Sequence, residues 1–216
     1  MSDDLPAGPT ADKAGLRREL LARRRQRSDT DRWRDAAQLA ADLPGLLSAL
    51  GADPSRPLCL YVPVRHEPGA APDGSTPLLD AAVSLGRRVL LPVTVGAGPG
   101  EETGPLDWAT FHDRGDLAPG PHGLLEPSGR RLGPDAVADA AVVVVPALAA
   151  SPTGVRLGRG GGHYDRTLPL VGRATVVVAL VGDDELRESL PAEPHDVPVD
   201  AVWRPTAGLL RTAGTP

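Results

Sequence analysis

The chain has 216 residues, 41% of them hydrophobic, which is enough for one good-sized core and predicts a single globular domain. Its formal net charge of −5 and its 3% content of aromatic residues argue against a general nucleic-acid-binding protein, because such proteins need basic surfaces and rings that stack on bases. Cys59 is the only cysteine, no Cys/His cluster has zinc-site spacing, and no leader or membrane-spanning run is found, so we expect a cytoplasmic protein without a membrane or nucleic-acid partner.

The amino-terminal region predicts a disordered lead-in over residues 1–11, followed by a basic helix. Asp12 can cap this helix, which runs to about Arg27 and carries Lys13 and Arg17 four positions apart on one face. Lys13 is the only lysine among 23 basic residues. Where Arg serves almost every cationic role, a retained Lys indicates either a site that requires a compact ammonium group or chance retention on a solvated face.

A second helix is expected from a cap at Thr30 to Leu50, although Pro44 must bend or break it. Two shorter helices are predicted over residues 78–85 and 165–170. From Leu58 onward the sequence also contains short apolar runs, rich in valine, that are typical of buried strands. These strands are expected at residues 58–62, 89–91, 106–111, 142–145, 175–180 and 201–203.

Continuous apolar strands that alternate with helices indicate an α/β fold with a mainly parallel sheet and helices on both faces, preceded by the basic helix. The Pro/Gly-rich stretches 66–77 and 95–105 are expected to be loops. We predict one α/β domain over residues 12–206 and a flexible tail over residues 207–216.

The most informative motif is Arg156-Leu-Gly-Arg-Gly-Gly-Gly-His-Tyr-Asp165, which follows the strand predicted at residues 142–145. Glycines allow backbone N–H groups to converge on an anion, and ligands of parallel sheets bind beyond the carboxyl ends of the strands. The two arginines and the closing aspartate suit a phosphate and its metal counter-ion. The motif fits neither a Walker loop nor a dinucleotide-binding turn.

Two further segments carry candidate polar residues. Glu67 follows a predicted strand and is either a carboxylate that accepts hydrogen bonds from a polar ligand or an ordinary loop residue. Asp196 lies in a Pro-rich segment and is either a metal ligand or a turn cap. No nucleophile motif for covalent catalysis is found, and phosphoryl chemistry requires only positioned cations, Mg²⁺ and carboxylates.

Five ordered motifs together resemble the 5-formyltetrahydrofolate cyclo-ligase family, also called methenyltetrahydrofolate synthetases. They are Lys13-Ala-Gly-Leu-Arg17, Glu67 after a strand, Gly123-Leu-Leu-Glu-Pro127, the glycine-rich motif at residues 156–165, and Leu190-Pro-Ala-Glu-Pro-His-Asp196. The resemblance spans residues 12–203. It implies a Rossmann-like fold and an ATP- and Mg²⁺-dependent ring closure of 5-formyltetrahydrofolate to 5,10-methenyltetrahydrofolate, with release of ADP and phosphate.

The resemblance also implies roles for individual residues. Arg159 and Tyr164 would be catalytic, with Arg159 near the transferred phosphate. Asp165 and Asp196 would hold Mg²⁺. ATP would contact Lys13, Arg17, Arg156, Leu157, Gly158, Arg159, Gly160, Gly161, Gly162, His163 and Tyr164. Folate would contact Val62, Glu67, Arg159, Gly160, Gly161, Gly162 and His163.

Two alternatives remain at the level of sequence. Many family members carry Lys where this chain has Gly161, which leaves open a folate- or nucleotide-binding protein with weak or no catalysis. The other alternative is a relative that acts on a different formamide or carboxylate. In each case the expected partners are small molecules, ATP and a reduced folate for the leading hypothesis, and the protein is expected to be a monomer or a small homo-oligomer.

Overall fold

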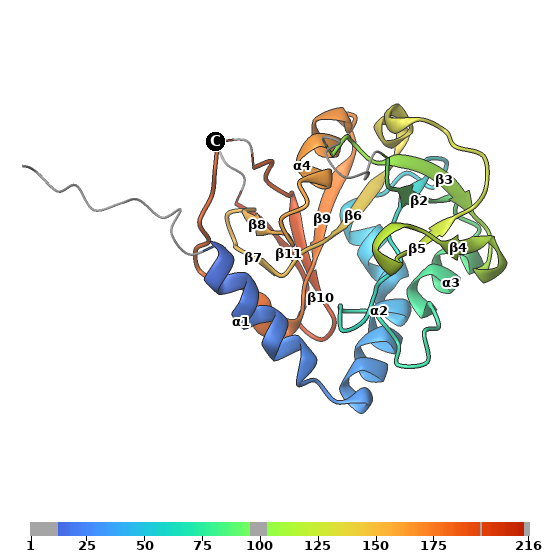
Figure 1. The fold of residues 1–216 in the computed structure, drawn as a ribbon. Coiled ribbons are helices and arrows are strands. Elements are labelled where there is room, and N and C mark those ends of the chain that lie inside the picture. Colours follow the sequence, from blue (N-terminus) through green and yellow to red (C-terminus); the bar gives the residue numbers. More distant parts are fainter. Residues whose placement is uncertain (1–12, 96–102, 195, 214–216) are drawn as a thin grey trace, which may run out of the picture.

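The computed structural model describes residues 13–95, 103–194 and 196–213. The predicted lead-in, the cap at Asp12 and most of the loop at residues 95–105 lie outside these ranges. A seven-stranded sheet forms the centre of the fold, in the order β11-β10-β9-β6-β1-β2-β3 (Figure 1). Its strands are β1 Leu58–Cys59, β2 Val89–Val93, β3 Asp107–Phe111, β6 Val142–Pro146, β9 Val176–Leu180, β10 Ala201–Arg204 and β11 Gly208–Arg211.

Five neighbouring strands of this sheet are parallel: β2, β1, β6, β9 and β10. Numbered along the chain, they lie in the order 2-1-3-4-5, so the direction of winding reverses between β1 and β6. The edge strands β3 and β11 are antiparallel to their neighbours. The predicted mainly parallel sheet is therefore confirmed. Two small antiparallel pairs lie outside it, β4 Leu117–Pro119 with β5 Leu125–Pro127 and β7 Ala149–Ala150 with β8 Arg156–Leu157.

The prediction of a flexible tail from residue 207 is wrong for Gly208–Arg211, which form β11 against β10. The turn between the two strands is held by Asp183, whose carboxylate accepts hydrogen bonds from the backbone N–H groups of Thr206 at 3.2 Å and Ala207 at 2.8 Å. Asp183 precedes these residues by more than 20 positions. Local composition at the end of the chain therefore gives no sign of the strand.

Helices cover both faces of the sheet, as predicted. One face carries α2 Asp29–Leu50 and α3 Pro77–Ser84, and the other carries α4 His163–Thr167 with short 3-10 segments. The amino-terminal helix α1 Lys13–Arg25 lies beside β7 and β8 (Figure 1), where Leu20 packs with Ala149 and Leu157. The 3-10 segments are η2 Arg114–Asp116, η3 Pro121–Gly123, η4 Pro134–Asp139, η5 Leu168–Leu170 and η6 Asp183–Glu185.

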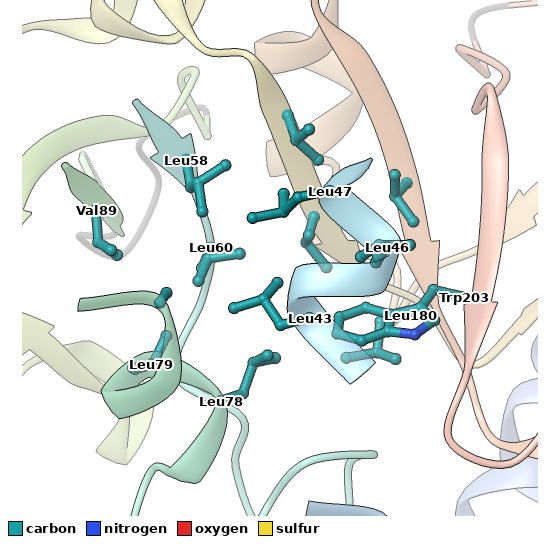
Figure 2. Close-up of a cluster of buried hydrophobic side chains, with 14 of the residues drawn as sticks. Leu43, Leu46, Leu47, Leu58, Leu60, Leu78, Leu79, Val89, Leu180 and Trp203 are labelled. Atoms are coloured by element: carbon teal, nitrogen blue, oxygen red, sulfur yellow. The ribbon is translucent and has the colours of Figure 1, made fainter. Parts of the chain in front are cut away.

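The alternation of side chains along the strands divides the core into two layers. In β1, Leu58 belongs to the cluster under α2 and α3, and Cys59 belongs to the cluster on the opposite face. Figure 2 shows leucines of α2 and α3 gathered with Trp203 of β10 and with Leu60, which follows β1. The indole N–H of Trp203 donates to Asp42 of α2 at 3.0 Å, so this large side chain is fixed as well as buried.

Helix α2 differs from its prediction in two respects. Its cap is Ser28, not Thr30, because the Ser28 hydroxyl accepts a hydrogen bond from the Asp31 N–H at 3.1 Å. The helix also continues through Pro44. Residues before and after the proline, Leu43 and Leu46 among them, are buried in the core. Their burial offsets the cost of about 3 kcal/mol for an interior proline.

No helix within the described ranges combines the length and apolar character needed to cross a membrane.

Candidate active site

A cavity of about 270 Å³ lies at the carboxyl ends of the parallel strands, where the strand order reverses between β1 and β6. Its wall includes Tyr61 and Val62 just after β1, Thr94 just after β2, and Ala147 just after β6. Predicted strand 58–62 ends early, at Cys59, so the residues beyond it turn away from the sheet ladder and form the wall. A reversal of this kind leaves the crevice in which ligands of open α/β sheets bind.

Every residue selected from the sequence for the site lines this one cavity. The segments that supply them are separated by up to 183 positions along the chain. Their individual roles stay predictions, but their convergence is a property of the fold. The residues are Lys13, Arg17, Val62, Glu67, the continuous segment from Arg156 to Asp165, and Asp196.

Helix α1 places two cations on the cavity. The Nζ atom of Lys13 lies 2.9 Å from Oδ2 of Asp196 and 3.2 Å from Oε1 of Glu193. Burial disfavours the charged ammonium, but these two carboxylates outweigh it and hold the pKa of Lys13 above its ordinary value. Arg17 donates from Nε to the carbonyl oxygen of Gly158 at 3.0 Å. The helical face predicted for Lys13 and Arg17 is therefore the face that meets the glycine-rich loop.

The glycine-rich loop joins β8 to α4. Gly160 and Gly162 have φ angles of 98° and 68°, which residues with a Cβ rarely adopt. The atoms nearest to a Cβ on Gly160 would be those of the Arg17 guanidinium, the first of them at 3.5 Å, so the backbone conformation and not crowding requires glycine there. Helix α4 begins at His163, earlier than predicted, and becomes a 3-10 segment near Pro169, which has no N–H for the helical ladder.

Two carboxylates are fixed by cations within the cavity wall. Oδ1 of Asp165 lies 2.6 Å from Nη2 of Arg156, whose side chain is almost fully buried. Asp196 is held by Lys13 and also accepts a hydrogen bond from the Glu193 N–H at 2.7 Å. Both aspartates are thus anchored by residues of the same site.

Glu67 is 6% exposed and forms an ion pair with Arg159, from Oε1 to Nη2 at 3.1 Å. Its other oxygen, Oε2, accepts a hydrogen bond from the Val64 N–H at 3.0 Å. Burial raises the pKa of Glu67, and Arg159 and the Val64 N–H oppose that rise without cancelling it. The sequence left a ligand-binding Glu67 and an ordinary loop residue open. The structure places Glu67 in the cavity wall, and its role stays a prediction.

Burial raises the pKa of the Tyr164 phenol far above its ordinary value, and the nearby Glu67 carboxylate adds to the effect. The phenol is therefore neutral at physiological pH. It can donate a hydrogen bond but cannot act as a general base. This limits the catalytic role predicted for Tyr164 to hydrogen bonding.

The structure adds cavity residues that the sequence did not single out by role. Arg24 lies seven positions after Arg17, so helical periodicity could have placed it on the same face of α1. Glu126 belongs to the motif at residues 123–127, which carried no assigned role. Leu124 and Leu125 belong to the same motif, whereas Pro92 and Leu106 lie in other segments and had no functional signal in the sequence.

The cavity combines two chemical environments. Lys13, Arg17, Arg156 and Arg159 supply positive charge beside the carboxylates of α4 and the Asp196 segment. The wall formed by β2, by β5 and by Leu106 just before β3 is largely apolar. Such a site can bind a polyanion together with a divalent cation and receive a partly apolar second ligand.

Comparison with known proteins gives consistent findings. The chain matches the model of the 5-formyltetrahydrofolate cyclo-ligase family over residues 9–205. It is 41% identical over 198 residues to a 5-formyltetrahydrofolate cyclo-ligase of Mycolicibacterium smegmatis, and the match covers 92% of this chain and 96% of that protein. A 5-formyltetrahydrofolate cyclo-ligase of Escherichia coli is 34% identical over 133 residues, which are 60% of this chain and 70% of that protein.

Two solved structures share the fold. The 5,10-methenyltetrahydrofolate synthetase of Aquifex aeolicus superposes with a TM-score of 0.71 at 25% identity and covers 94% of each chain. A 5,10-methenyltetrahydrofolate synthetase from Mycoplasma pneumoniae superposes with a TM-score of 0.65 at 17% identity, over 88% of this chain and 97% of that one.

Proposed function

The chain belongs to the 5-formyltetrahydrofolate cyclo-ligase family, and on that premise we propose that it closes 5-formyltetrahydrofolate to 5,10-methenyltetrahydrofolate in an ATP- and Mg²⁺-dependent reaction. The protein is then a ligase of one-carbon metabolism. Its substrates are two small molecules, a reduced folate and ATP.

The chemistry requires activation of a poor leaving group. The formyl oxygen attacks the γ-phosphorus of ATP, and ADP leaves. N10 then attacks the activated formyl carbon and loses its proton, and the carbon–oxygen bond breaks so that the oxygen departs with inorganic phosphate. No covalent enzyme intermediate is needed, so the protein contributes positioning and charge stabilisation.

The cationic part of the cavity supports ATP binding. Lys13, Arg17, Arg156 and Arg159 place four cationic groups on one cavity. Three of them are paired with carboxylates of the site, and Mg²⁺ held by Asp165 and Asp196 would neutralise two of those carboxylates when bound. The backbone of residues 157–164 would contact the nucleotide. Within this segment, Arg159 would stabilise the transferred phosphoryl group, and the Tyr164 phenol would act as a hydrogen-bond donor.

Asp165 and Asp196 suit a magnesium ion. Mg²⁺ in nucleotide sites is held by one or two carboxylates together with phosphate oxygens and water. Among the described residues, no group of three or more His, Cys, Asp and Glu side chains forms a complete protein cage. Two carboxylates beside a triphosphate site therefore fit this ion, which would neutralise phosphate charge when bound.

The folate would occupy the part of the cavity bordered by Val62 and Glu67, with the segment from Arg159 to His163 facing the formyl group. The Glu67 carboxylate would accept hydrogen bonds from the donor edge of the pterin. Its ion pair with Arg159 joins the proposed folate site directly to the residue proposed to act on the phosphate.

One observation carries the proposal most strongly. Helix α1 and the glycine-rich loop, 141 positions apart, meet through the hydrogen bond from Arg17 to the Gly158 carbonyl, and together they gather the cations on one cavity. Two carboxylates beside a phosphate site would hold Mg²⁺ in a nucleotide-binding protein as well as in an enzyme, so the conversion assay separates these two candidates. An enzyme for another formamide or carboxylate would share them, and substrate tests separate that candidate.

The test is a spectrophotometric assay of purified protein with 5-formyltetrahydrofolate, ATP and Mg²⁺, following the methenyl chromophore. We expect the chromophore to form only when ATP and Mg²⁺ are both present. Saturable ligand binding without conversion would instead support the binding protein. Phosphate release from ATP without folate would point to another substrate.

We further propose that residues 12–206 act as one catalytic domain in the cytoplasm, as a monomer or small homo-oligomer. The cavity supports this proposal because the described parts of this one chain supply all of the proposed ATP, folate and metal residues.

A further inference from the structure

Glu126 is a buried carboxylate in the cavity wall that none of the roles above uses. It lies in β5, is 9% exposed, and lines the cavity together with its neighbours Leu124 and Leu125 and with Thr94. Carboxylates are rarely buried to this extent unless they are paired.

Its surroundings differ from those of the other cavity carboxylates. Glu67, Asp165 and Asp196 each have an Arg or Lys nitrogen within 3.1 Å. In the parts of the chain that the structure describes, Glu126 has no Lys, Arg or His partner within 4.0 Å. Its Oε1 atom accepts one hydrogen bond from the Thr94 N–H at 3.0 Å.

A carboxylate can accept about four hydrogen bonds, and an apolar environment makes missing ones costly. The cavity residues supplied by the segments next to Glu126 are Pro92, Thr94, Leu106, Leu124 and Leu125, of which only Thr94 has a side-chain donor. Among the described residues, the Thr94 N–H is the one donor bonded to this carboxylate, which leaves acceptor capacity for a ligand that enters the cavity.

The hairpin that carries Glu126 holds its side chain in place. The carboxylate packs directly against Gly120. A Cβ added to Gly120 would lie 2.7 Å from the Cδ atom of Glu126, so there is no room for a side chain at this position. The Gly120 N–H donates to the Leu124 carbonyl at 2.7 Å, which closes the turn of the hairpin. Backbone and side chain together set the position of the carboxylate.

We infer that Glu126 is a specificity-determining residue that accepts a hydrogen bond from an N–H group of the reduced folate, separate from the pterin edge assigned to Glu67. This inference rests on the proposed function. Reduced folates carry N–H donors on both the pterin ring and N10, whereas ATP carries N–H donors only on its adenine amino group and its triphosphate is repelled by a carboxylate. Glu126, which pairs with no cation among the described residues and lies in the largely apolar wall, therefore favours the folate over the nucleotide.

The test compares Glu126→Gln with the wild type by calorimetric titration of 5-formyltetrahydrofolate and, separately, of ATP with Mg²⁺. The amide keeps an oxygen for the Thr94 N–H but removes the charge. We expect the folate Kd to rise about tenfold to a hundredfold, as for loss of a charged hydrogen bond, while the ATP Kd changes less than about twofold. Glu188→Gln, which removes the same charge from an exposed position, is the matched control.

Gly120→Ala is a second probe that leaves the carboxylate present but displaces it. We expect it to weaken folate binding and leave ATP binding unchanged. The inference is overturned if Glu126→Gln binds folate as the wild type does, or if it weakens both ligands equally. Failure of the wild type to bind 5-formyltetrahydrofolate would overturn the proposed function itself and the inference with it.

Discussion

Glu67 connects the protonation state of the site to folate binding. Burial raises its pKa, so it takes up a proton at a higher pH than an exposed glutamate does. A protonated Glu67 loses charge and acceptor capacity toward the pterin. We therefore predict that the folate Kd of the wild type rises as the pH falls from about 7 to about 5, above the ordinary glutamate pKa of about 4.3.

The matched measurement is the same titration on Glu67→Gln. Its affinity should be lower throughout but nearly constant over this pH range, because the amide does not titrate. The carboxylates of the folate itself titrate equally in both experiments. Parallel pH dependence of the two proteins would contradict the assignment of Glu67.

Gly160 and Gly161 of the glycine-rich loop differ in whether their backbone conformation requires a residue without a Cβ. Gly160 has a φ of 98°, whereas Gly161 lies outside the left-handed region and its Cβ would meet only a movable His163 ring atom at 3.2 Å. We predict that Gly160→Ala lowers the free energy of unfolding by about 1–3 kcal/mol and weakens ATP binding. Gly161→Ala should change stability by less than about 1 kcal/mol. Denaturant titration measures the free energy of unfolding of each variant, and calorimetry measures its affinity for ATP. Equal losses of stability in Gly160→Ala and Gly161→Ala would contradict the argument from the φ angle.

At the scale of elements, the position of α1 decides whether Lys13 and Arg17 reach the cavity. A helix of 13 residues is marginal in isolation, so it depends on its contacts with the body of the protein. Arg24 provides the main polar contact. It pairs with both oxygens of Glu185 at 2.6 and 2.7 Å and donates to the Ala147 carbonyl at 2.6 Å.

We predict that Arg24→Met lowers the free energy of unfolding by about 3–5 kcal/mol, because Glu185 is left buried without its cation. Arg23→Met is the control, since Arg23 forms an exposed pair with Asp184 worth at most about 1 kcal/mol. The double variant Arg24→Met with Glu185→Leu should recover much of the loss. Similar effects of the two single variants in urea unfolding would contradict this role for the pair.

The predicted and observed elements agree where the signal is local. The Val-rich run of β6 and the helical spacing of α2 are read directly from neighbouring residues. The direction of β3 and the existence of β11 depend on long-range pairing with β2 and β10. The alternation of side chains along a strand of five residues is the same in either direction. The sequence of such a strand therefore does not reveal which strand it pairs with or in which direction.

The site shows the same division. Motif order was enough to select Lys13, Glu67 and the glycine-rich loop, and the fold brings them together. The sequence could not show that Asp165 pairs with Arg156 or that Glu126 enters the same wall. Those relations depend on how separate loops pack at the end of the sheet.

At the scale of the whole molecule, Cys59 reports on global unfolding. It lies in the central strand β1, is fully buried, and burial raises the pKa of its thiol far above the ordinary value. We predict that a disulfide reagent such as Ellman's reagent modifies the native protein at least roughly a hundredfold more slowly than the protein unfolded in guanidinium. As the chain has one cysteine, complete reaction gives one thiol per chain. Fast reaction of the native protein would contradict a closed core.

The central claim is that one cavity transfers a phosphoryl group to the formyl oxygen before the ring closes. The most direct measurement uses 5-formyltetrahydrofolate labelled with ¹⁸O in the formyl group and follows the label by mass spectrometry of the released phosphate. The account predicts that each inorganic phosphate carries the formyl oxygen. Methenyl formation with unlabelled phosphate, and the label released into water, would contradict it.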